Sequence, residues 1–477
     1  MHNAPTVPST CIGYEFARAK LGDARLSARL LALAEALAAA PSLSLPQALR
    51  RSKAQLEAAY RFFGNDAVTM PAILEPHQAQ THERMTQHQV VLVVHDTTTL
   101  EYSGEREGIG PLGGAKHRGF LLHAALAVTA DGTRQPLGVL AARTWARSEA
   151  KRPKVKGRSM NGPQYARIDD KESQRWARQI EQVHLDDGGT QLVHVADREG
   201  DAYPLLQWLH ETGKHYIIRA ARDRRIEDDD DDLLRLSDAC ARATQMVELD
   251  VPISARKAKS APRAARTHPG RDRRTAKLCV SAFSVDLKRP AFLGPGAILP
   301  VNVAYVRELD APADAAPIEW VLYTSLPIDT PGEVLAIVEH YRARWMIEEL
   351  FKALKTGCQI EKLQLESYAA LTNALAVYLP IAWSILALRS MERSNPTAPA
   401  TAVMSQTQLA VLRHFSSYKL GPQPSVRDGL LAVAALGGYI PHRKPPGWLV
   451  LARGMHDLLR YELVWNAAKT ACDVRDP

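Results

Sequence analysis

Two aspartates and one glutamate, far apart in the sequence, have the side chains needed to hold divalent metal ions. Asp96 ends the run VVLVVHD, Asp197 ends QLVHVAD, and Glu348 lies in RARWMIEELFK. Carboxylates without a His or Cys partner favour Mg²⁺ or Mn²⁺ over zinc. Two such ions about 3.5–4 Å apart can stabilise the attacking and leaving oxygens of a phosphodiester displacement. These residues therefore suit metal-dependent phosphodiester cleavage.

Each aspartate follows an apolar run that is typical of a buried strand. Residues 90–94 are all valine or leucine, and residues 191–196 are mostly apolar. Such runs predict strands covered on both faces, each with its aspartate at the carboxyl end. Taken alone, an aspartate in that position is more often a turn or helix-capping residue. The interpretation as a metal site therefore depends on the order of the surrounding elements.

That order is the one found in an RNase H-like α/β fold. Between the two aspartates the sequence predicts two hairpin strands and a helix, and after the second aspartate another strand, at residues 120–129, 135–144, 171–183 and 216–219. In an RNase H-like core the aspartates lie on adjacent strands and the glutamate faces them from a packed helix. We therefore predict an RNase H-like catalytic core.

A β-rich insertion is expected within this core, at about residues 235–325. Its strands are predicted from short β-branched runs at 247–253, 278–285, 303–307 and 320–324. Lys and Arg dominate two connecting segments, a loop at 151–158 and a linker at 256–277. A single long helix is expected over residues 333–355.

This long helix carries a stripe of polar side chains on one face. At about 100° per residue, an arc of about 60° contains Tyr341, Arg344, Glu348 and Lys355. Glu349 lies to the side of the arc, so Glu348 is the preferred metal ligand. An exposed helix with ion pairs such as Glu348–Lys352 would explain the charges, but not the tyrosine and Arg344 on the same face. A carboxylate flanked by cations and a phenol suits a metal ion with neighbouring phosphates.

The composition is that of a globular protein with several domains. The 477 residues are 46% hydrophobic and 23% charged, which is enough for about two to four domains. The net charge of +8 is compatible with nucleic-acid binding without establishing it. Five scattered cysteines without C-x-x-C spacing argue against a disulfide framework and a zinc site.

Two further stretches bear on location and partners. The apolar stretch at residues 374–388 contains Pro380 and predicts a buried helix, not a membrane span. Since the N-terminus shows no secretory signal, we expect a cytoplasmic protein. Residues 14–63 are expected to be helical, with breaks near Pro41 and Pro46, and arginines and lysines punctuate them. They are interpreted either as a solvated bundle or as a module that faces a phosphate backbone.

The motifs around the three carboxylates resemble those of the DDE transposases of the insertion-sequence-four group, which includes the transposase of transposon five. The hallmark Y-x2-R-x3-E-x6-K of that group is matched by Tyr341, Arg344, Glu348 and Lys355. The segments HDTTTL around Asp96 and ADREGDAY around Asp197 also match. LGDARLSAR, AAYRFF and LGGYIPHRKPPGW extend the similarity over nearly the whole chain.

The resemblance implies a cut-and-paste reaction with two Mg²⁺ ions per active site, which Mn²⁺ can replace, held by Asp96, Asp197 and Glu348. It implies phosphate contacts by Tyr341, Arg344 and Lys355, and by Arg219 after the strand at 216–219. It implies that Trp320, in EWVLYTSLP, stabilises a base displaced from the duplex. Contacts to the transposon ends are implied for Arg25, Arg29, Lys53, Tyr60 and Arg61.

The resemblance also implies a domain organisation and partners. We expect a helical end-binding domain at residues 1–69, the catalytic domain at 70–372 and a helical dimerisation domain at 373–477. The expected partners are double-stranded transposon ends, target DNA and a second copy of the chain on paired ends.

Two departures from the family pattern leave the recognised DNA sequence open. No Lys-Tyr pair follows Arg29, and the loop before Lys171 is basic instead of acidic. Two alternative functions are an RNase H-type nuclease that acts on RNA–DNA hybrids and an inactive, transposase-derived DNA-binding protein. The basic N-terminal module and Trp320 argue against the first, and retention of all three carboxylates argues against the second.

Overall fold

The computed structural model describes residues 12–50, 52–114, 117–148, 172–183, 189–227, 235–255, 272–312, 316–440 and 445–473. The expected basic loop at 151–158 and most of the linker at 256–277 lie outside these ranges. The chain forms two compact units: the first comprises Met1–Lys154, Val183–Gln191 and Trp345–Pro477, and the second comprises Val155–Gln182 and Leu192–Arg344. Each unit is described by itself.

The first unit begins with helices, as the sequence predicted: α1 (Ile12–Phe16), α2 (Ala24–Ala38), α3 (Leu45–Ala48), α4 (Lys53–Phe63) and α5 (Met70–Met85). Several of these helices have a side chain that caps their N-terminus. Asp23 accepts a hydrogen bond from the backbone N–H of Arg25, and Ser52 accepts one from Gln55. The apolar face of α2 is fully buried through Leu30 and Leu37.

The strands of the first unit are β1 (Val90–Glu101), β2 (Gly110–Gly114), β3 (His117–Thr129) and β4 (Pro136–Trp145), and β3 pairs antiparallel with the other three. Asp96 lies opposite Ala124 of β3 in the interior of β1. The expectation that Asp96 ends its strand is therefore wrong. The reason is that the following residues, Thr97 to Leu100, are good strand formers and continue the pairing with β3.

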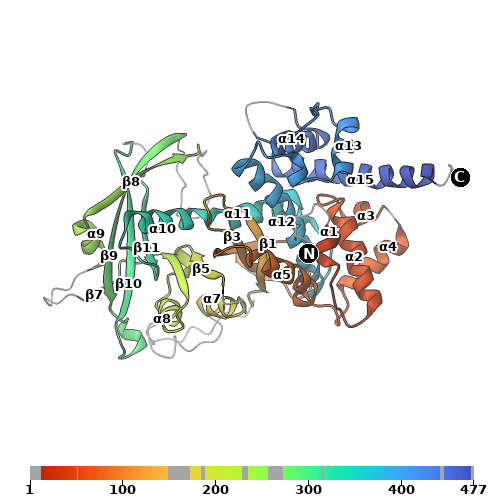
Figure 1. Ribbon diagram of the computed structural model, residues 1–477. Helices are drawn as coiled ribbons and strands as arrows, with labels where there is room; N and C mark the ends of the chain where they lie inside the picture. The colour runs from red at the N-terminus through yellow and green to blue at the C-terminus, as the bar shows by residue number, and fades with distance from the viewer. Residues whose placement is uncertain are drawn as a thin grey trace. The chain divides into compact units, whose positions relative to one another are not determined.

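Helices complete the first unit: α11 (Trp345–Lys352), the π turn η3 (Ala353–Gly357), the 3-10 turns η4 (Ile360–Lys362) and η5 (Ala400–Ala402), α12 (Tyr368–Ser394), α13 (Gln406–Phe415), α14 (Val426–Leu436) and α15 (Trp448–Asp473). The last three pack together (Figure 1). By length and hydropathy α12 could cross a membrane, but 94% of its apolar window is buried inside the protein. The prediction of a buried helix at residues 374–388 is thus confirmed.

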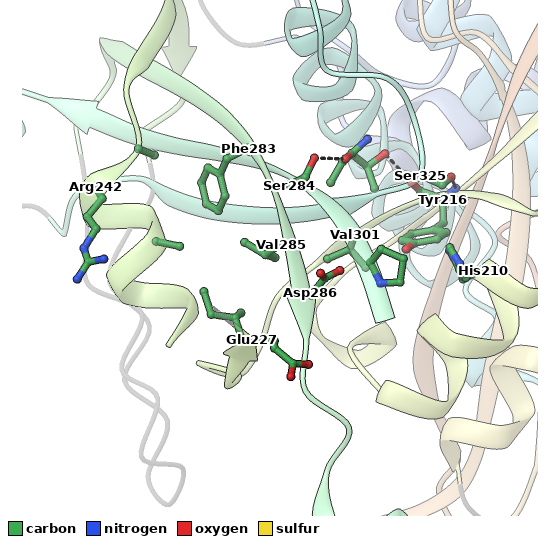
Figure 2. Close-up of a pocket in the computed structure, with 16 residues that line it drawn as sticks. His210, Tyr216, Glu227, Arg242, Phe283, Ser284, Val285, Asp286, Val301 and Ser325 are labelled. Carbon is green, nitrogen blue, oxygen red and sulfur yellow. Dashed lines mark hydrogen bonds between the residues drawn. The ribbon is translucent and has the colours of Figure 1, made fainter. Parts of the chain in front are cut away.

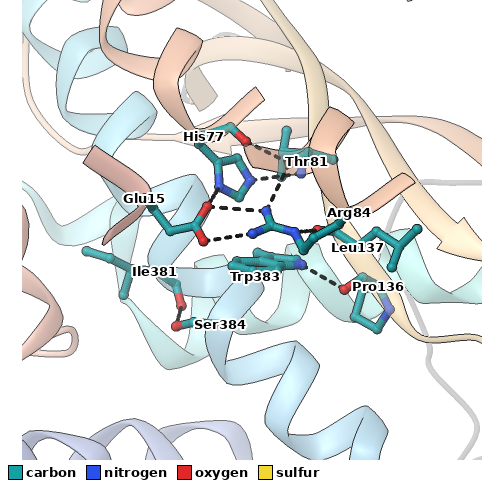
Figure 3. Close-up of polar contacts among 10 residues, drawn as sticks. Glu15, His77, Thr81, Arg84, Pro136, Leu137, Ile381, Trp383 and Ser384 are labelled. Atoms are coloured by element: carbon teal, nitrogen blue, oxygen red, sulfur yellow. Dashed lines mark hydrogen bonds and ion pairs between the residues drawn. The ribbon is translucent and has the colours of Figure 1, made fainter. Parts of the chain in front are cut away.

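A buried polar network connects α1, α5, β4 and α12 (Figure 3). Glu15 accepts hydrogen bonds from Nδ1 of His77 at 2.6 Å and from Arg84 at 2.9 Å. Because Nε2 of His77 accepts from the backbone N–H of Val139 at 2.9 Å, this ring is neutral, with its proton on Nδ1. The guanidinium of Arg84 lies 4.4 Å from the ring centroid of Trp383. The network fixes the N-terminal helices to the strands of the first unit.

The second unit contains α7 (Glu172–Glu181), β5 (Gln191–Ala196), η1 (Arg198–Gly200), α8 (Tyr203–Glu211), β6 (His215–Arg219), β7 (Ile226–Glu227), α9 (Leu236–Arg242), β8 (Gln245–Ile253), β9 (Arg274–Leu287), η2 (Ala291–Leu293), β10 (Leu299–Leu309), β11 (Glu319–Thr324) and α10 (Pro331–Ala343). Its strand order is β5-β6-β11-β10-β9-β7, and β8 pairs with β9. Among the described strands of the second unit, only β5 and β6 pair in parallel, and the other pairs are antiparallel.

The predicted fold class is confirmed. The described part of the chain begins and ends with helices, and the strands of an RNase H-like core come between them in the sequence (Figure 1). Strands β7 to β11 form the β-rich insertion. The expectation of one helix over residues 333–355 is wrong, because α10 ends at Ala343 and α11 begins at Trp345. Arg344, the C-cap of α10, keeps right-handed helical backbone angles. Neither Gly nor Pro stands at this end of the helix, so the sequence carries no signal for it. The boundaries of the three predicted domains stay predictions.

Candidate active site

Asp96 and Glu348 lie on elements of the first unit that pack against each other. Helix α11 contacts β1 and β3, and its Ile347 and Leu350 are fully buried. Both carboxylates are half-buried. Oδ1 of Asp96 accepts a hydrogen bond from the backbone N–H of Thr97 at 2.8 Å, which orients the carboxylate.

The neighbouring glutamate, Glu349, has a different environment. It is buried, and its two oxygens accept hydrogen bonds from the guanidinium of Arg393 at 2.6 and 3.3 Å. This bidentate pair joins α11 to α12 and gives Glu349 a structural role. Glu348 stays the predicted metal ligand.

Lys355 is held against the end of β1. Its Nζ donates to the backbone oxygen of Thr99 at 2.5 Å and lies 3.8 Å from Oε1 of Glu361. The same Glu361 oxygen accepts from the backbone N–H of Glu101 at 3.0 Å. The π turn therefore brings the hallmark lysine to the strand that contains Asp96.

In the second unit Asp197 directly follows β5, as expected. It caps η1, and its Oδ1 accepts from the backbone N–H of Glu199 at 2.8 Å. Because β5 and β6 are parallel with Ala196 opposite Ile218, Asp197 and Arg219 come next on adjacent strands at the same edge. Asp197 and Arg219 thus occupy neighbouring backbone positions at the carboxyl ends of these strands.

Arg219 is the centre of a cationic cluster with aromatic neighbours. Its Nη2 donates to the backbone oxygen of Glu319 at 2.8 Å. Burial lowers the pKa of Arg219, a hydrogen bond with Tyr341 opposes this effect, and the nearby charges of Arg198 and Arg344 add to it. A guanidinium that feels other arginine charges suits phosphate oxygens, which it can bind in a bidentate manner.

The two candidate aromatic residues of the second unit contact each other. The ring centroids of Trp320 and Tyr341 are 5.4 Å apart. Trp320 is half-buried and packs on a cluster that includes Val306 and Val338, while Tyr341 is only 6% exposed. Both are therefore part of the packing of the second unit as well as candidates for DNA contact.

The predicted end-binding residues lie on the exposed sides of α2 and α4. Arg25 pairs with Asp23 at 3.0 Å, Arg29 donates to Gln55 at 2.7 Å, and Lys53 lies 3.8 Å from Glu57. Tyr60 and Arg61 are exposed near the end of α4. Exposed pairs of this kind contribute little to the stability of the fold, so contacts with DNA phosphates can replace them.

Sequence reasoning missed three contributors near the predicted site. Trp345 is 51% exposed one turn before Glu348, and Nζ of Lys352 lies 4.7 Å from its ring centroid. The sequence signal for Trp345 was an aromatic residue at a position outside the apolar face of the helix. Arg198 and Asp201 stand in the ADREGDAY motif, but only the three-dimensional contacts separate their roles from that of Asp197.

Within the described ranges, no group of three or more His, Cys, Asp or Glu side chains is arranged to hold a metal ion. A hollow of about 700 Å³ in the second unit is lined by Tyr216, Phe283, Arg242, Glu227, Asp286 and neighbouring residues (Figure 2). None of the candidate site residues lines it.

Comparison with known proteins gives two family matches. Residues 10–68 match the transposase DNA-binding family, and residues 169–382 match the transposase DDE domain family. The second match includes Asp197 and Glu348, whereas Asp96 lies between the two matched segments. Among solved structures, the chain is similar to the piggyBac transposase synaptic complex with hairpin DNA, with 9% identity and a TM-score of 0.31. That match covers 67% of this chain and 50% of the solved chain, so it spans about half of the solved chain's length.

Proposed function

We propose that this chain, which carries a transposase DNA-binding domain and a transposase DDE domain, is an active DNA transposase. The observation that carries the proposal is the combination of the two family matches with Asp197 and Arg219 at neighbouring positions on the carboxyl ends of β5 and β6. A DNA-binding module supplies recognition, and the DDE segment supplies residues for phosphodiester chemistry.

The proposed reaction is cut-and-paste transposition, as the motif resemblance implies. Water attacks a phosphodiester at the transposon end and releases a 3′ hydroxyl. That hydroxyl attacks the opposite strand to form a hairpin, which a second water opens. The 3′ ends then attack target DNA, and each attack displaces one 3′ oxygen from phosphorus.

Asp96, Asp197 and Glu348 would hold two Mg²⁺ ions, or Mn²⁺ in their place. Their chemistry fits these ions, because all three are carboxylates and an adjacent backbone N–H orients each of the two aspartates. When bound, such ions activate the attacking oxygen and stabilise the leaving one.

The surrounding residues would bind and orient the DNA. Contacts to end phosphates are proposed for Tyr341, Arg344, Lys355 and Arg219, and end binding for Arg25, Arg29, Lys53, Tyr60 and Arg61. Trp320 would stabilise a displaced base, which offsets part of the few kcal/mol that unstacking costs. The exposed ring of Trp345 offers a second surface for a base. A homodimer on paired ends would use α13 to α15.

The first prediction tests the three carboxylates. We expect Asp96→Ala, Asp197→Ala and Glu348→Ala each to reduce Mg²⁺-dependent end cleavage to background while retaining end binding. The substrate is linear DNA that carries the inverted repeats flanking the gene, and gel-shift and cleavage assays use the same preparations. Full cleavage by any variant would remove that residue from the assignment. Degradation of RNA–DNA hybrids without end cleavage would instead favour an RNase H-type nuclease.

A further inference from the structure

The second aspartate of the ADREGDAY motif, Asp201, is enclosed by hydrogen-bond donors. Its side chain is 0% exposed. Oδ2 accepts from the backbone N–H groups of Ala221 at 2.7 Å and Arg222 at 3.1 Å. Oδ1 accepts from Nε of Arg224 at 3.1 Å and also from its Nη2. With both oxygens occupied inside the protein, Asp201 is excluded as a metal ligand in this arrangement.

The Asp201–Arg224 pair joins two loops. Asp201 belongs to the loop after β5, and Arg224 belongs to the loop after β6. Nη2 of Arg224 also donates to the backbone oxygen of Asp201 at 3.2 Å, and its guanidinium lies 6.0 Å from the ring centroid of Tyr203. Arg224 is 8% exposed. The two loops are therefore fixed to each other at the edge where Asp197 and Arg219 lie.

A glycine holds the first loop close to the strands. A Cβ on Gly200 would lie 2.8 Å from Cβ of Ala196, 3.3 Å from Trp176 and 3.5 Å from Ile218. The first of these contacts is too short for any side chain, so the turn η1 lies directly on the ends of β5 and β6. The segment from Asp197 to Asp201 is thus anchored at its strand end, at Gly200 and at the buried ion pair.

We propose that Asp201 and Arg224 form a positioning pair that sets the placement of Asp197 relative to Arg219. This inference rests on the proposed function, in which Asp197 holds a metal ion and Arg219 contacts a phosphate. A buried ion pair is often no more stabilising than apolar residues of the same volume, so its advantage here is geometric. Displacement of a reacting group by about 1 Å can cost about a hundredfold in rate.

The test uses two conservative changes and a matched control. Asp201→Asn keeps the shape and removes the charge, and Arg224→Lys keeps the charge and removes the bidentate geometry. Arg222→Lys is the control, because Arg222 lies in the same loop and its side chain is exposed. Single-turnover cleavage is measured on preformed end complexes, together with end binding, circular dichroism at the assay temperature and amide exchange of peptides covering residues 197–206.

We expect both Asp201→Asn and Arg224→Lys to slow cleavage by about tenfold to a hundredfold, as changes next to metal ligands do. End binding and the folded fraction should be unchanged, and amide exchange near Glu199 should be faster. Because the pair acts as a unit, the double variant should be no slower than the slower single variant. The control should behave as the unchanged protein.

Three results would overturn the proposal: an unchanged cleavage rate in both single variants, an unchanged amide exchange at residues 197–206, or a rate loss that equals the loss of folded protein. Asp197→Ala, assayed in parallel, separates this inference from the proposed function. If that variant cleaves fully, the metal-ligand assignment fails. If it is inactive while the pair variants are normal, only the positioning role fails.

Discussion

Two adjacent glutamates on α11 differ in what surrounds them. Glu349 points to Arg393 of α12 and is buried, whereas Glu348 is half-buried on the helix that packs on β1. Mutation of a residue that packs should lower stability and preserve activity. Mutation of a proposed metal ligand should preserve stability and abolish activity. This contrast gives the second prediction.

Glu349→Gln should lower the free energy of unfolding by about 1–3 kcal/mol, the range for losing a hydrogen bond to a charged group and leaving its partner unsatisfied. The same variant should still cleave transposon ends. Glu348→Gln should leave stability unchanged and abolish cleavage. Urea unfolding and the end-cleavage assay measure both effects. If Glu349→Gln loses cleavage while remaining folded, the roles of the two glutamates are reversed.

At the residue scale, periodicity predicts which face of a helix a side chain occupies, but not which partner it meets. The choice of Glu348 over Glu349 came from the helical arc alone. The partner of Glu349, Arg393, is 44 residues away, and no local pattern connects them. For the same reason the sequence could not separate Asp201 from Asp197, because the partners of Asp201 follow a different strand.

The network of Glu15, His77 and Arg84 is a contact between elements, and it makes the first unit sensitive to acid. Burial alone would raise the pKa of Glu15, but hydrogen bonds from His77 and Arg84 and the charge of Arg84 outweigh it and lower the pKa from 4.5 to about 2. Burial also lowers the pKa of His77 below 6.5, although Glu15 opposes this. In the folded protein both groups therefore hold fewer protons than in the unfolded chain.

The third prediction follows from these signs. The contribution of His77 is lost as pH falls below 6.5, and that of Glu15 is present above 4.5 and lost as pH falls toward 2. We expect the melting temperature to fall in both intervals. Glu15→Gln should remove the lower step and cost about 3–5 kcal/mol at neutral pH, because it leaves Arg84 buried beside a neutral group. Circular dichroism melts from pH 7 to pH 3 measure this. An unchanged pH profile in Glu15→Gln would contradict it.

Helices and strands were predicted correctly where a local sequence pattern determines them. The end of a strand was misplaced where pairing with a distant strand determines it. The Val and Leu runs predicted β1 and β5, and the apolar stretch predicted α12. The end of β1 was misplaced because Thr97 to Leu100 pair with β3, and pairing with a distant strand is not visible in a local run. The break between α10 and α11 follows no Gly or Pro, so no helix-stop signal was available.

On the scale of the whole molecule, the chain returns to its first unit after completing the second. A division into contiguous segments cannot describe this arrangement, because residues 345–477 lie in the same compact unit as the strands formed from residues 90–145. Composition sets the expected number of domains but not which segments associate. The two family matches cover residues 10–68 and 169–382, and the predicted domain organisation stays a prediction.

The C-terminal helices offer a surface for the proposed homodimer. Phe415 of α13 stacks on Tyr461 of α15 at 4.5 Å, and His414 lies 4.9 Å from the ring of Trp465. Next to these rings on α15, Leu463 is 54% exposed and Val464 is 64% exposed. Neighbouring exposed apolar side chains on a helix beside aromatic rings are typical of an interface.

The final prediction concerns this surface. Leu463→Asp and Val464→Asp should leave binding to a single transposon end unchanged, because the proposed end-binding residues lie on α2 and α4. They should abolish the complex of two ends and, with it, cleavage that requires paired ends, since burying an unpaired carboxylate in an apolar interface is costly. Native gels with one labelled and one unlabelled end of different length measure pairing. Gln423→Asp, which adds the same charge at an exposed loop position, is the matched control. Persistence of paired complexes in both helix variants would show that the chain pairs its ends through another surface, while loss of pairing in the control as well would attribute the effect to charge alone.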